Sequence, residues 1–418
     1  MPEHLIGLLL GTEDDWPRVF EALVAKLPPV EHGGQTHTFR TERITNEPFD
    51  LRARPRYELV IDRLGWWYEI AREWVKKAAL MDDVYLLNNP FTFQAMEKHS
   101  AYCAMIRLGL KVPETWMVPH KVPTTVPRRE YMLAEKFQHM ATRYNLPFDL
   151  GGVAEQVGYP LYMKPFDGGQ WVGVTRVANE DELHRQYDAS GQRLMHLQAA
   201  VDGFDVFVRS LSIGAETMVM WFDPDAPMHL RYRVEHDFLE PKVGREVVTI
   251  SRLVNAFFRW EFNSCESLVR GTGVHPIDYA NASPDVALTS LHYYFPWAMQ
   301  ALVKWCVFCT VTGRLMPIDQ DKRVYFDIGD RDDLSYEQKL EEYRRLADGY
   351  FQVEEYDDFC ARSLPAVREL ALDYFASPEF DALLVEEVRA LFPAHEHEEM
   401  IARHRGLVGA WVGDQAKS

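Results

Sequence analysis

The chain has 418 residues, of which 47% are hydrophobic and 26% charged, a composition that excludes disorder and predicts two to four globular domains. Its formal net charge of −18 argues against general nucleic-acid binding, because such binding depends on Lys and Arg meeting phosphates. No apolar run approaches the roughly 20 residues that span a bilayer. The short apolar run Leu5–Leu10 precedes acids and is unlike a secretory signal, so we expect a cytoplasmic protein without membrane contact.

Cysteine and histidine give little indication of metal chemistry. The five cysteines are an odd, scattered set, which argues against a disulfide framework. Cys306 and Cys309 form a lone CxxC in an apolar run, without a second Cys/His pair at zinc spacing, so we expect buried thiols. His395, His397 and His404 are expected on a solvated helix, with a metal site as the open alternative.

Strand-like and helix-like segments alternate over the first 120 residues. Short apolar runs end at turn residues, and the segments between them have helical periodicity. This alternation predicts an N-terminal α/β domain over residues 1–120. The expected elements are the strand Leu5–Leu10, the helix Arg18–Leu27, the strand Asp83–Leu87, the helix Ala95–Leu108 and a strand after Val112.

Residues 159–177 are the most informative stretch of the chain. An apolar strand delivers Lys164, a turn with Gly168 and Gly169 follows, and a second apolar strand returns. Glycines let the backbone approach phosphates closely, and Gly173 in the returning strand indicates another close approach. The hairpin predicts a clamp for a polyphosphate, although Lys164 alone is also compatible with an ordinary surface lysine.

This hairpin belongs to a predicted α+β lid domain over residues 121–202, compact from about residue 145. A lid helix begins at the N-cap Asn179, followed by three acids that suit the helix dipole. Residues 203–330 are expected to form a strand-rich third domain and residues 331–418 a helical extension. The expected segments are the lid strand Leu194–Val201, the third-domain strands Asp205–Ile213, Glu216–Trp221, Ala256–Phe262 and Pro276–Tyr279, and the terminal helices Tyr336–Ala347, Ala366–Tyr374, Asp381–Leu391 and Glu396–Arg405.

Two carboxylates and an amide lie on segments separated by one turn. Glu266 precedes the turn, and Asp278 and Asn281 follow it. Such hard oxygen ligands suit Mg²⁺, which bridges a few protein groups to nucleotide phosphates. The alternative is that Glu266 and Asp278 are solvated acids at strand ends.

Arginines recur in the same part of the chain. Arg209 lies in an expected strand, Arg231 and Arg233 alternate so that one strand face would carry both, and Arg270 follows Glu266 by four residues. Several guanidinium groups converging on one region would suit anionic substrate oxygens or a phosphoryl group in transfer. Each one alone is also compatible with a surface salt bridge.

The lysine hairpin, the arginines and the two acids with the amide, in their order along the chain, resemble the motifs of the ATP-grasp superfamily over about residues 80–300. Lys98 opens a helix before Gly-Leu-Lys-Val-Pro-Glu-Thr and is similar to the first ATP-contacting lysine of that family. Lys164 is similar to the second, and Asp167–Gly173 resembles the flexible phosphate loop. The resemblance implies an α/β and α+β fold of three domains with a C-terminal helical extension, and ATP between the lid and the third domain.

The resemblance also implies roles for the residues around the adenine, the ribose and the metal. Gln198 and Val201 fall on the strand that is expected to lie along the adenine, and Asp205 resembles the acid that binds the ribose. Arg209 resembles the arginine one strand further on. The residues that resemble the family's magnesium ligands are Glu266, Asp278 and Asn281. Two departures stand out. Ala199 replaces a Glu that many members carry, and two residues instead of one separate Asp278 from Asn281.

What the resemblance implies about activity is an ATP- and Mg²⁺-dependent ligase, with Mn²⁺ as an alternative metal. It would join a small carboxylate to an amine or thiol through an acyl phosphate and release ADP and phosphate. Arg209, with Arg231 or Arg270, would stabilise charge in the transfer. An ATP-grasp phosphotransferase, a non-catalytic ATP-binding partner protein and a homodimeric state all stay open.

Overall fold

The computed structural model describes residues 1–92, 97–121, 135–136, 139, 143, 147–169, 171–281 and 283–417. Three of the sequence-based expectations fall partly outside these ranges. They are the beginning of the helix Ala95–Leu108, the first part of the lid domain 121–202, and Gln170 in the phosphate loop.

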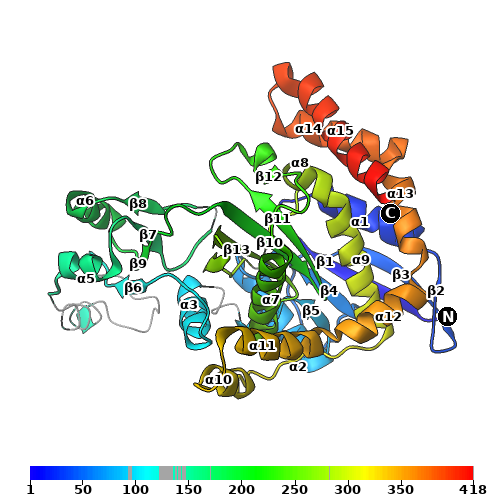
Figure 1. Ribbon diagram of the computed structural model, residues 1–418. Helices are drawn as coiled ribbons and strands as arrows, with labels where there is room; N and C mark the ends of the chain where they lie inside the picture. The colour runs from blue at the N-terminus through cyan, green and yellow to red at the C-terminus, as the bar shows by residue number, and fades with distance from the viewer. Residues whose placement is uncertain are drawn as a thin grey trace.

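Five strands in the order β2-β3-β1-β4-β5 form the N-terminal sheet, which is parallel apart from the β2–β3 hairpin (Figure 1). Strand β4 is buried along its whole length, as the apolar run Leu59-Val60-Ile61 requires, and β1 is buried from its second residue onward. The expected alternation of strands and helices is confirmed. The elements are β1 (Glu3–Leu9), α1 (Asp15–Lys26), β2 (Val30–His32), β3 (Gln35–Arg43), β4 (Leu59–Asp62), α2 (Glu69–Asp82), β5 (Tyr85–Leu87) and α3 (Lys98–Arg107).

The lid is a four-stranded antiparallel sheet, β6-β9-β7-β8, with α5 and α6 packed on it, and it projects sideways from the rest of the molecule (Figure 1). It has its own hydrophobic core, which includes Leu161 and Leu197. The strand expected after Val112 forms as β6 but pairs with β9, so it joins the lid sheet and not the N-terminal one. The elements are β6 (Thr115–Val118), α5 (Leu150–Val157), β7 (Leu161–Pro165), β8 (Thr175–Val177), α6 (Glu180–Ser190) and β9 (Met195–Ala199).

The third sheet is antiparallel, with the order β12-β11-β10-β13-β14, and α7 packs on it. The prediction of a strand over Ala256–Phe262 is wrong except at Phe262, where β13 begins. Ala256–Phe258 ends α7, because the apolar side chains there continue the helical spacing that includes Ile250 and Leu253. The elements are β10 (Val206–Ile213), β11 (Glu216–Phe222), η2 (Met228–Leu230), β12 (Tyr232–Arg233), α7 (Pro241–Phe258), β13 (Phe262–Arg270) and β14 (Gly273–Asp278).

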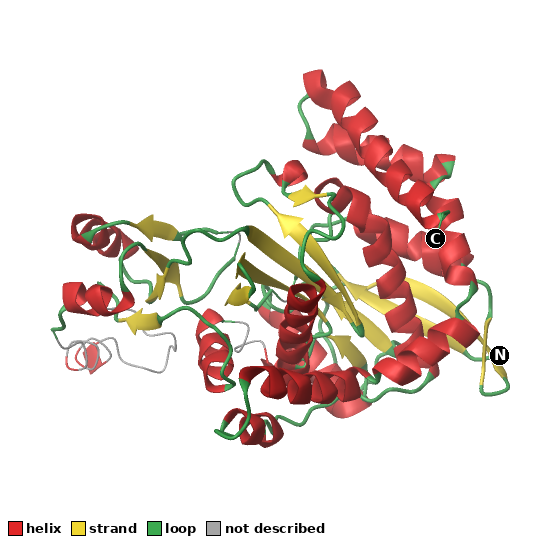
Figure 2. Cartoon of the chain, viewed as in Figure 1, coloured by secondary structure: helices red, strands yellow, loops and turns green. Residues whose placement is uncertain are grey.

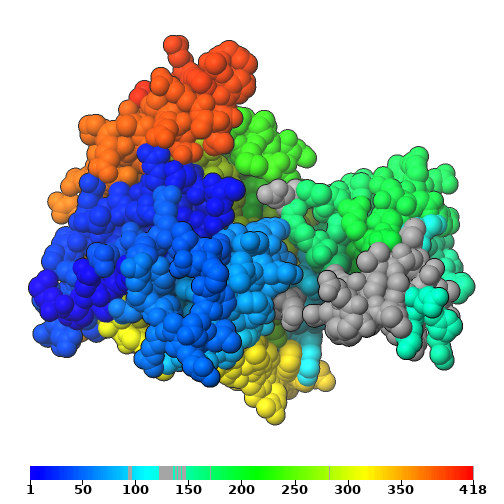
Figure 3. Space-filling view, turned by 180° about the vertical axis from the view of Figure 1, so that it is seen from behind, coloured from blue at the N-terminus to red at the C-terminus, as the bar shows by residue number. Residues whose placement is uncertain are grey.

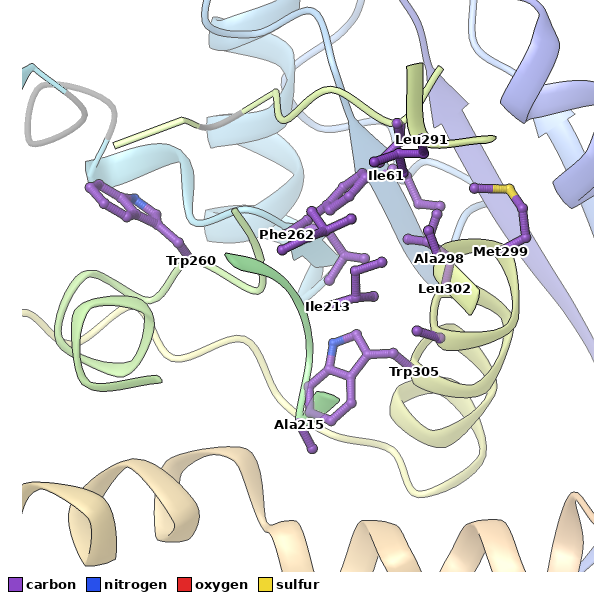
Figure 4. Close-up of a cluster of buried hydrophobic side chains, with 14 of the residues drawn as sticks. Ile61, Ile213, Ala215, Trp260, Phe262, Leu291, Ala298, Met299, Leu302 and Trp305 are labelled. Carbon is purple, nitrogen blue, oxygen red and sulfur yellow. The ribbon is translucent and has the colours of Figure 1, made fainter. Parts of the chain in front are cut away.

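The long apolar helix α9 (Phe295–Val311) joins the N-terminal and third sheets into one core. Figure 4 shows its side chains, including Leu302 and Trp305, beside Ile61 of β4 and Ile213 of β10. Trp305 covers the β10–β11 turn so closely that a Cβ on Gly214 would lie 1.9 Å from the indole. Only glycine fits there, since Gly214 also has a φ of +55°.

The C-terminal helices pack on the body of the molecule, chiefly on α1, α7 and α9 (Figure 2). The four expected helices are confirmed, and α12 was not foreseen. The elements after β14 are α8 (Leu288–Leu291), η3 (His292–Tyr294), α9, α10 (Arg323–Gly329), α11 (Tyr336–Phe351), α12 (Val353–Ser363), α13 (Ala366–Phe375), α14 (Pro378–Leu391), η4 (Ala394–Glu396) and α15 (His397–Gln415). Seen from behind, the lid stands beside the N-terminal domain, and the last helices of the chain, in orange and red, lie above that domain (Figure 3).

One buried carboxylate ties these helices to both large sheets. Glu261, just before β13, is 2% exposed and accepts hydrogen bonds from the hydroxyls of Tyr85 (2.6 Å) and Tyr350 (2.8 Å). The indole nitrogen of Trp305 donates to its other oxygen at 2.8 Å, and Arg314 lies 3.5 Å away. The terminal helices are therefore joined to the core through polar as well as apolar contacts.

Candidate functional site

A cavity of about 510 Å³ opens where the N-terminal domain, the lid and the third sheet meet. Lys98 at the start of α3 lines it, and so do Lys164 and the glycine turn of the lid. The third sheet contributes Arg209, Glu266 and Asp278. The cavity thus gathers cations and carboxylates from segments that are far apart in the sequence.

The charged groups of the third sheet are aligned by strand register. Arg209 on β10 is paired with Glu266 on β13, and Glu266 is paired in turn with Asp278 on β14. Side chains at paired positions lie on the same face of a sheet. Burial raises the pKa of Glu266, with the neighbouring Asp278 acting in the same direction and the Arg209 guanidinium opposing both.

Glu266 and Asp278 are the groups best placed to hold a divalent cation. Among the described residues, no set of three or more His, Cys, Asp or Glu side chains gathers in a metal-binding arrangement. Two carboxylates nevertheless suffice for Mg²⁺ when substrate phosphates and water supply the remaining oxygens. The pair lies in the same cavity as the two lysines, so the donor set fits a phosphate-bound Mg²⁺.

Lys98 links the lid to the third sheet. Its ammonium nitrogen lies 3.0 Å from Oδ2 of Asp278 and donates to the carbonyl of Gly168 at 3.0 Å. Burial alone would lower its pKa, but the carboxylates of Asp278, Glu266 and Asp167 together raise it. Lys98 is therefore a charged group at the junction of the lid and the acid pair.

Lys164 is buried on β7 and has no carboxylate partner among the described residues. It is 7% exposed, and its ammonium donates to Oε1 of Gln198 on β9 at 2.7 Å. The Gln198 amide nitrogen donates to Thr115 on β6 at 2.8 Å, which fixes the orientation of the amide. Burial lowers the pKa of Lys164 to about 8. Such a lysine gains most from an anion that enters the cavity beside it.

The glycine turn lies open to the cavity. Gly168 has a φ of +101°, and nothing lies within 4 Å of a Cβ built on Gly168 or Gly169. Their backbone is thus free of side-chain cover where it faces the two lysines. At Gly173 a Cβ would lie 2.5 Å from Arg193, so this glycine serves the packing of the lid itself.

Asn281 orients the guanidinium of Arg209. With its amide oxygen toward β10, it accepts from Nη2 of Arg209 at 2.9 Å and from the Ser264 hydroxyl at 3.0 Å, and its nitrogen donates to Ser283. Asn281 and Ser264 thus hold Arg209 at the cavity wall beside Glu266. Asn281 sits next to the acid pair, but its oxygen is already engaged.

The expectation that Arg231 and Arg233 share one strand face is wrong. Strand β12 spans only Tyr232–Arg233, and Arg231 caps the preceding 3-10 turn. Arg231 lines the cavity, whereas Arg233 pairs with Asp223 at 2.5 Å outside it. The turn breaks the two-residue alternation, so the two arginines have different surroundings.

Arg270 is not among the residues that line the cavity, and its expected role in the transfer stays a prediction. It lies exposed at the end of β13, and its Nη1 contacts the carbonyl of Asp202 at 3.4 Å. Asp205 is also exposed, and its carboxylate accepts from the amide of Gly271 at 2.7 Å. Gln198 and Val201 are buried and are not among the residues that line the cavity. The nucleotide contacts expected of Gln198, Val201 and Asp205 stay predictions.

The sequence-based analysis missed part of the wall, which comes from the N-terminal domain. Arg63, Trp66 and Trp67 follow β4 directly and line the cavity, as does Asp285 after β14. A sequence signal existed, because loops at the carboxyl ends of parallel strands build ligand sites in open α/β sheets. The strand β4, a four-residue apolar run ending in an acid, was not recognised.

The remaining sequence candidates lie away from the cavity. Cys306 and Cys309 are buried in α9, as expected, and burial raises the pKa of both thiols. His404 is fully buried and bonds the carbonyls of Met400 and Thr289, so the solvated helix face expected there is wrong for this residue. None of the described helices has the length and apolar character needed to cross a bilayer.

Solved structures with a similar fold include three whose descriptions name ligases or ATP-grasp proteins. D-alanine–D-alanine ligase from Bacillus anthracis, complexed with ATP, has a TM-score of 0.50 at 13% identity, covering 74% of this chain and 98% of that one. D-alanyl-alanine synthetase A from Vibrio cholerae has a TM-score of 0.49 at 14% identity, covering 75% of this chain and 100% of that one. A RimK-domain ATP-grasp protein from Sphaerobacter thermophilus has a TM-score of 0.46 at 13% identity, covering 68% of this chain and 93% of that one.

The fold of this chain is similar to that of the Bacillus anthracis enzyme, with a mixed α/β and α+β architecture and a C-terminal helical region. Its likeness to the ATP-bound D-alanine–D-alanine ligase extends over nearly the whole of that enzyme. No protein-family model matches the sequence, and no curated protein matches it.

Proposed function

We propose that this protein is an ATP- and Mg²⁺-dependent ligase that joins a carboxylate to an amine through an acyl phosphate. One observation carries the proposal. Two buried lysines, an unobstructed glycine turn and two carboxylates in strand register face a single cavity at the base of a lid with its own core. This combination suits a nucleoside triphosphate with its metal, in a fold that the ATP-bound D-alanine–D-alanine ligase shares.

The lysines and the glycine turn hold the phosphates. Lys164 exchanges its neutral partner Gln198 for phosphate oxygens, and Lys98 turns from Asp278 toward them. Amides of Gly168 and Gly169 approach the same oxygens, because no Cβ stands in the way. Glu266 and Asp278 would hold Mg²⁺, which supplies charge neutralisation at the β- and γ-phosphates when bound.

The transfer requires charge stabilisation at the γ-phosphoryl group. A carboxylate oxygen of the acid attacks the γ-phosphorus, the bond to the bridging oxygen breaks, and ADP leaves. Arg209, held in place by Asn281 and Ser264, is oriented to stabilise the negative charge on the transferring group. The amine nitrogen then attacks the acyl carbon, phosphate leaves, and the amine gives up a proton.

Exclusion of water protects the acyl phosphate. The lid has a separate hydrophobic core, so it can move as a unit over the cavity without disturbing the main core. Its contact through Lys98 and Gly168 joins it to the acid pair. A closed lid would keep the intermediate from hydrolysis.

An ADP-release screen over pairs of carboxylates and amines, with mass spectrometry of the products, tests the proposal. We expect a product whose mass is that of acid plus amine minus water. A phosphorylated acid as the stable product would indicate a phosphotransferase instead. ATP binding without ADP formation over the whole panel would indicate a non-catalytic ATP-binding protein. Lys164→Ala and Asp278→Ala should each abolish turnover, and full activity in both would contradict the site.

A further inference from the structure

Two segments of the cavity wall have no role in holding ATP or the metal. One is Arg63–Trp67, the loop after β4, and the other is Met228–Arg231, around η2. They come from the N-terminal domain and the third domain and line the same cavity as the phosphate-binding groups. If the proposed ligase function holds, this wall faces the second substrate of the ATP-dependent step, the acid.

The wall carries large apolar side chains that are exposed to solvent. Trp67 is 65% exposed and Met228 is 61% exposed. Trp171 and Val172 of the lid, which are 40% and 70% exposed, line the same cavity. A single exposed apolar residue needs no explanation, but several gathered around one cavity mark a binding surface. Apolar and aromatic side chains of this kind bury the apolar part of a small ligand.

Arg231 provides an anchor for an anionic group beside this surface. Its Nε donates to the carbonyl of Ala226 at 3.0 Å, which fixes the side chain, while its terminal nitrogens have no carboxylate partner within the described ranges. Arg63 differs, because Glu13 already pairs with it at 2.8 Å. An unpaired guanidinium fork in an acidic protein matches a carboxylate.

We propose that the acid accepted by this cavity carries a bulky apolar group, which packs against Trp67 and Met228 while Arg231 holds its carboxylate. Met228 and Arg231 lie three residues apart on one segment, so one ligand can contact both. The substrate class is therefore an aliphatic or aromatic acid, such as an amino acid with a large apolar side chain. Small polar acids leave the apolar wall exposed to water and gain nothing from it.

The test is a comparison of acids with one common nucleophile. Hydroxylamine converts any acyl phosphate to a hydroxamate, so the natural amine need not be known. Leucine, phenylalanine and 3-phenylpropionate are compared with alanine, serine and acetate in the presence of ATP and Mg²⁺. We expect kcat/KM to be about tenfold or more higher for the bulky acids.

Variants locate this preference on the wall. Trp67→Ala and Met228→Ala should each lower the ratio of kcat/KM between bulky and small acids about tenfold. Trp116→Ala, on the lid outside the cavity lining, is the matched control and should leave the ratio unchanged. Arg231→Met should raise KM for every acid, whereas Arg233→Met, two residues further on and paired with Asp223, should not.

Two results would overturn the inference in distinguishable ways. Hydroxamate formation from small polar acids at the same kcat/KM as from bulky ones would refute the substrate class and leave the ligase function standing. If Trp67→Ala and Met228→Ala leave the ratio of kcat/KM between bulky and small acids unchanged, the substrate class is likewise refuted and the ligase function still stands. Hydroxamate formation from none of the acids, with ATP bound, would overturn the proposed function and this inference with it.

Discussion

Glu266 and Asp278 lie directly opposite each other on the neighbouring strands β13 and β14, at a point where the register shifts by a bulge. The bulge falls between Glu266 and Ser267, and both acids line the cavity. The ammonium of Lys98 lies 3.0 Å from the carboxylate of Asp278 and places a positive charge beside the pair. The strand pairing thus creates the acid pair, and the lysine compensates it.

The acid pair predicts metal-dependent nucleotide binding. Asp278→Asn should weaken the binding of ATP in the presence of Mg²⁺ at least about tenfold, because Mg²⁺ relies on carboxylate charge. Binding of ATP in EDTA should change much less. Isothermal titration calorimetry under both conditions measures the effect, with Asp225→Asn in an exposed loop as the control. Equal Mg²⁺-dependent affinity in Asp278→Asn and wild type would refute the assignment.

The lowered pKa of Lys164 predicts a pH-dependent stability. Burial lowers this pKa from 10.5 to about 8 in the folded protein, so between these values the unfolded chain binds more protons than the folded one. The destabilisation is fully present below pH 8 and is relieved as pH rises from about 8 toward 10.5.

The free energy of unfolding of the nucleotide-free wild type should therefore rise relative to that of Lys164→Met between pH 7.5 and 10. Urea denaturation at several pH values measures this difference. Subtracting the two proteins removes the titration of the other lysines. A difference in the free energy of unfolding that is constant over the whole pH range would contradict a lowered pKa of Lys164.

Gly214 predicts a large packing effect. Gly214→Ala should lower the free energy of unfolding by about 3 kcal/mol or more, because its Cβ would overlap Trp305 in addition to the strained φ. Gly271→Ala is a matched control with a φ of +58° and nothing within 4 Å, so strain alone should cost about 1 kcal/mol. Chemical denaturation compares the two. Equal losses would show that the Trp305 contact does not constrain the turn.

Glu261 predicts that the terminal helices contribute to the stability of the whole chain. Glu261→Gln should cost about 3 kcal/mol, because it leaves the buried Arg314 and its partners Tyr85 and Tyr350 without a charged acceptor. Glu337→Gln on the exposed face of α11 should change stability by about 0.5 kcal/mol or less. Thermal unfolding measures both. A small effect at Glu261 would mean that apolar contacts alone hold these helices.

Much of the fold could be predicted from local pattern. The strands around Leu5 and Lys164 and the N-cap Asn179 depend on periodicity and capping, which act over a few residues. The prediction failed at Ala256, where the helical spacing that includes Ile250 and Leu253 continues α7 through residues that were expected in a strand. Arg231 and Arg233 were separated by a turn that no short-range pattern announced.

The sequence by itself determined the order of the two lysines, the glycine turn and the two acids along the chain, and so which residues are candidates for the chemistry. The tertiary structure alone decided which of them meet. Lys98 reaches Asp278 across 180 positions of the sequence, whereas Arg270, only four residues after Glu266, does not line the cavity. The tertiary structure also placed Trp67 and Met228 in the cavity wall. The physical reason is that strand register and domain packing, rather than separation along the chain, set the distances between side chains.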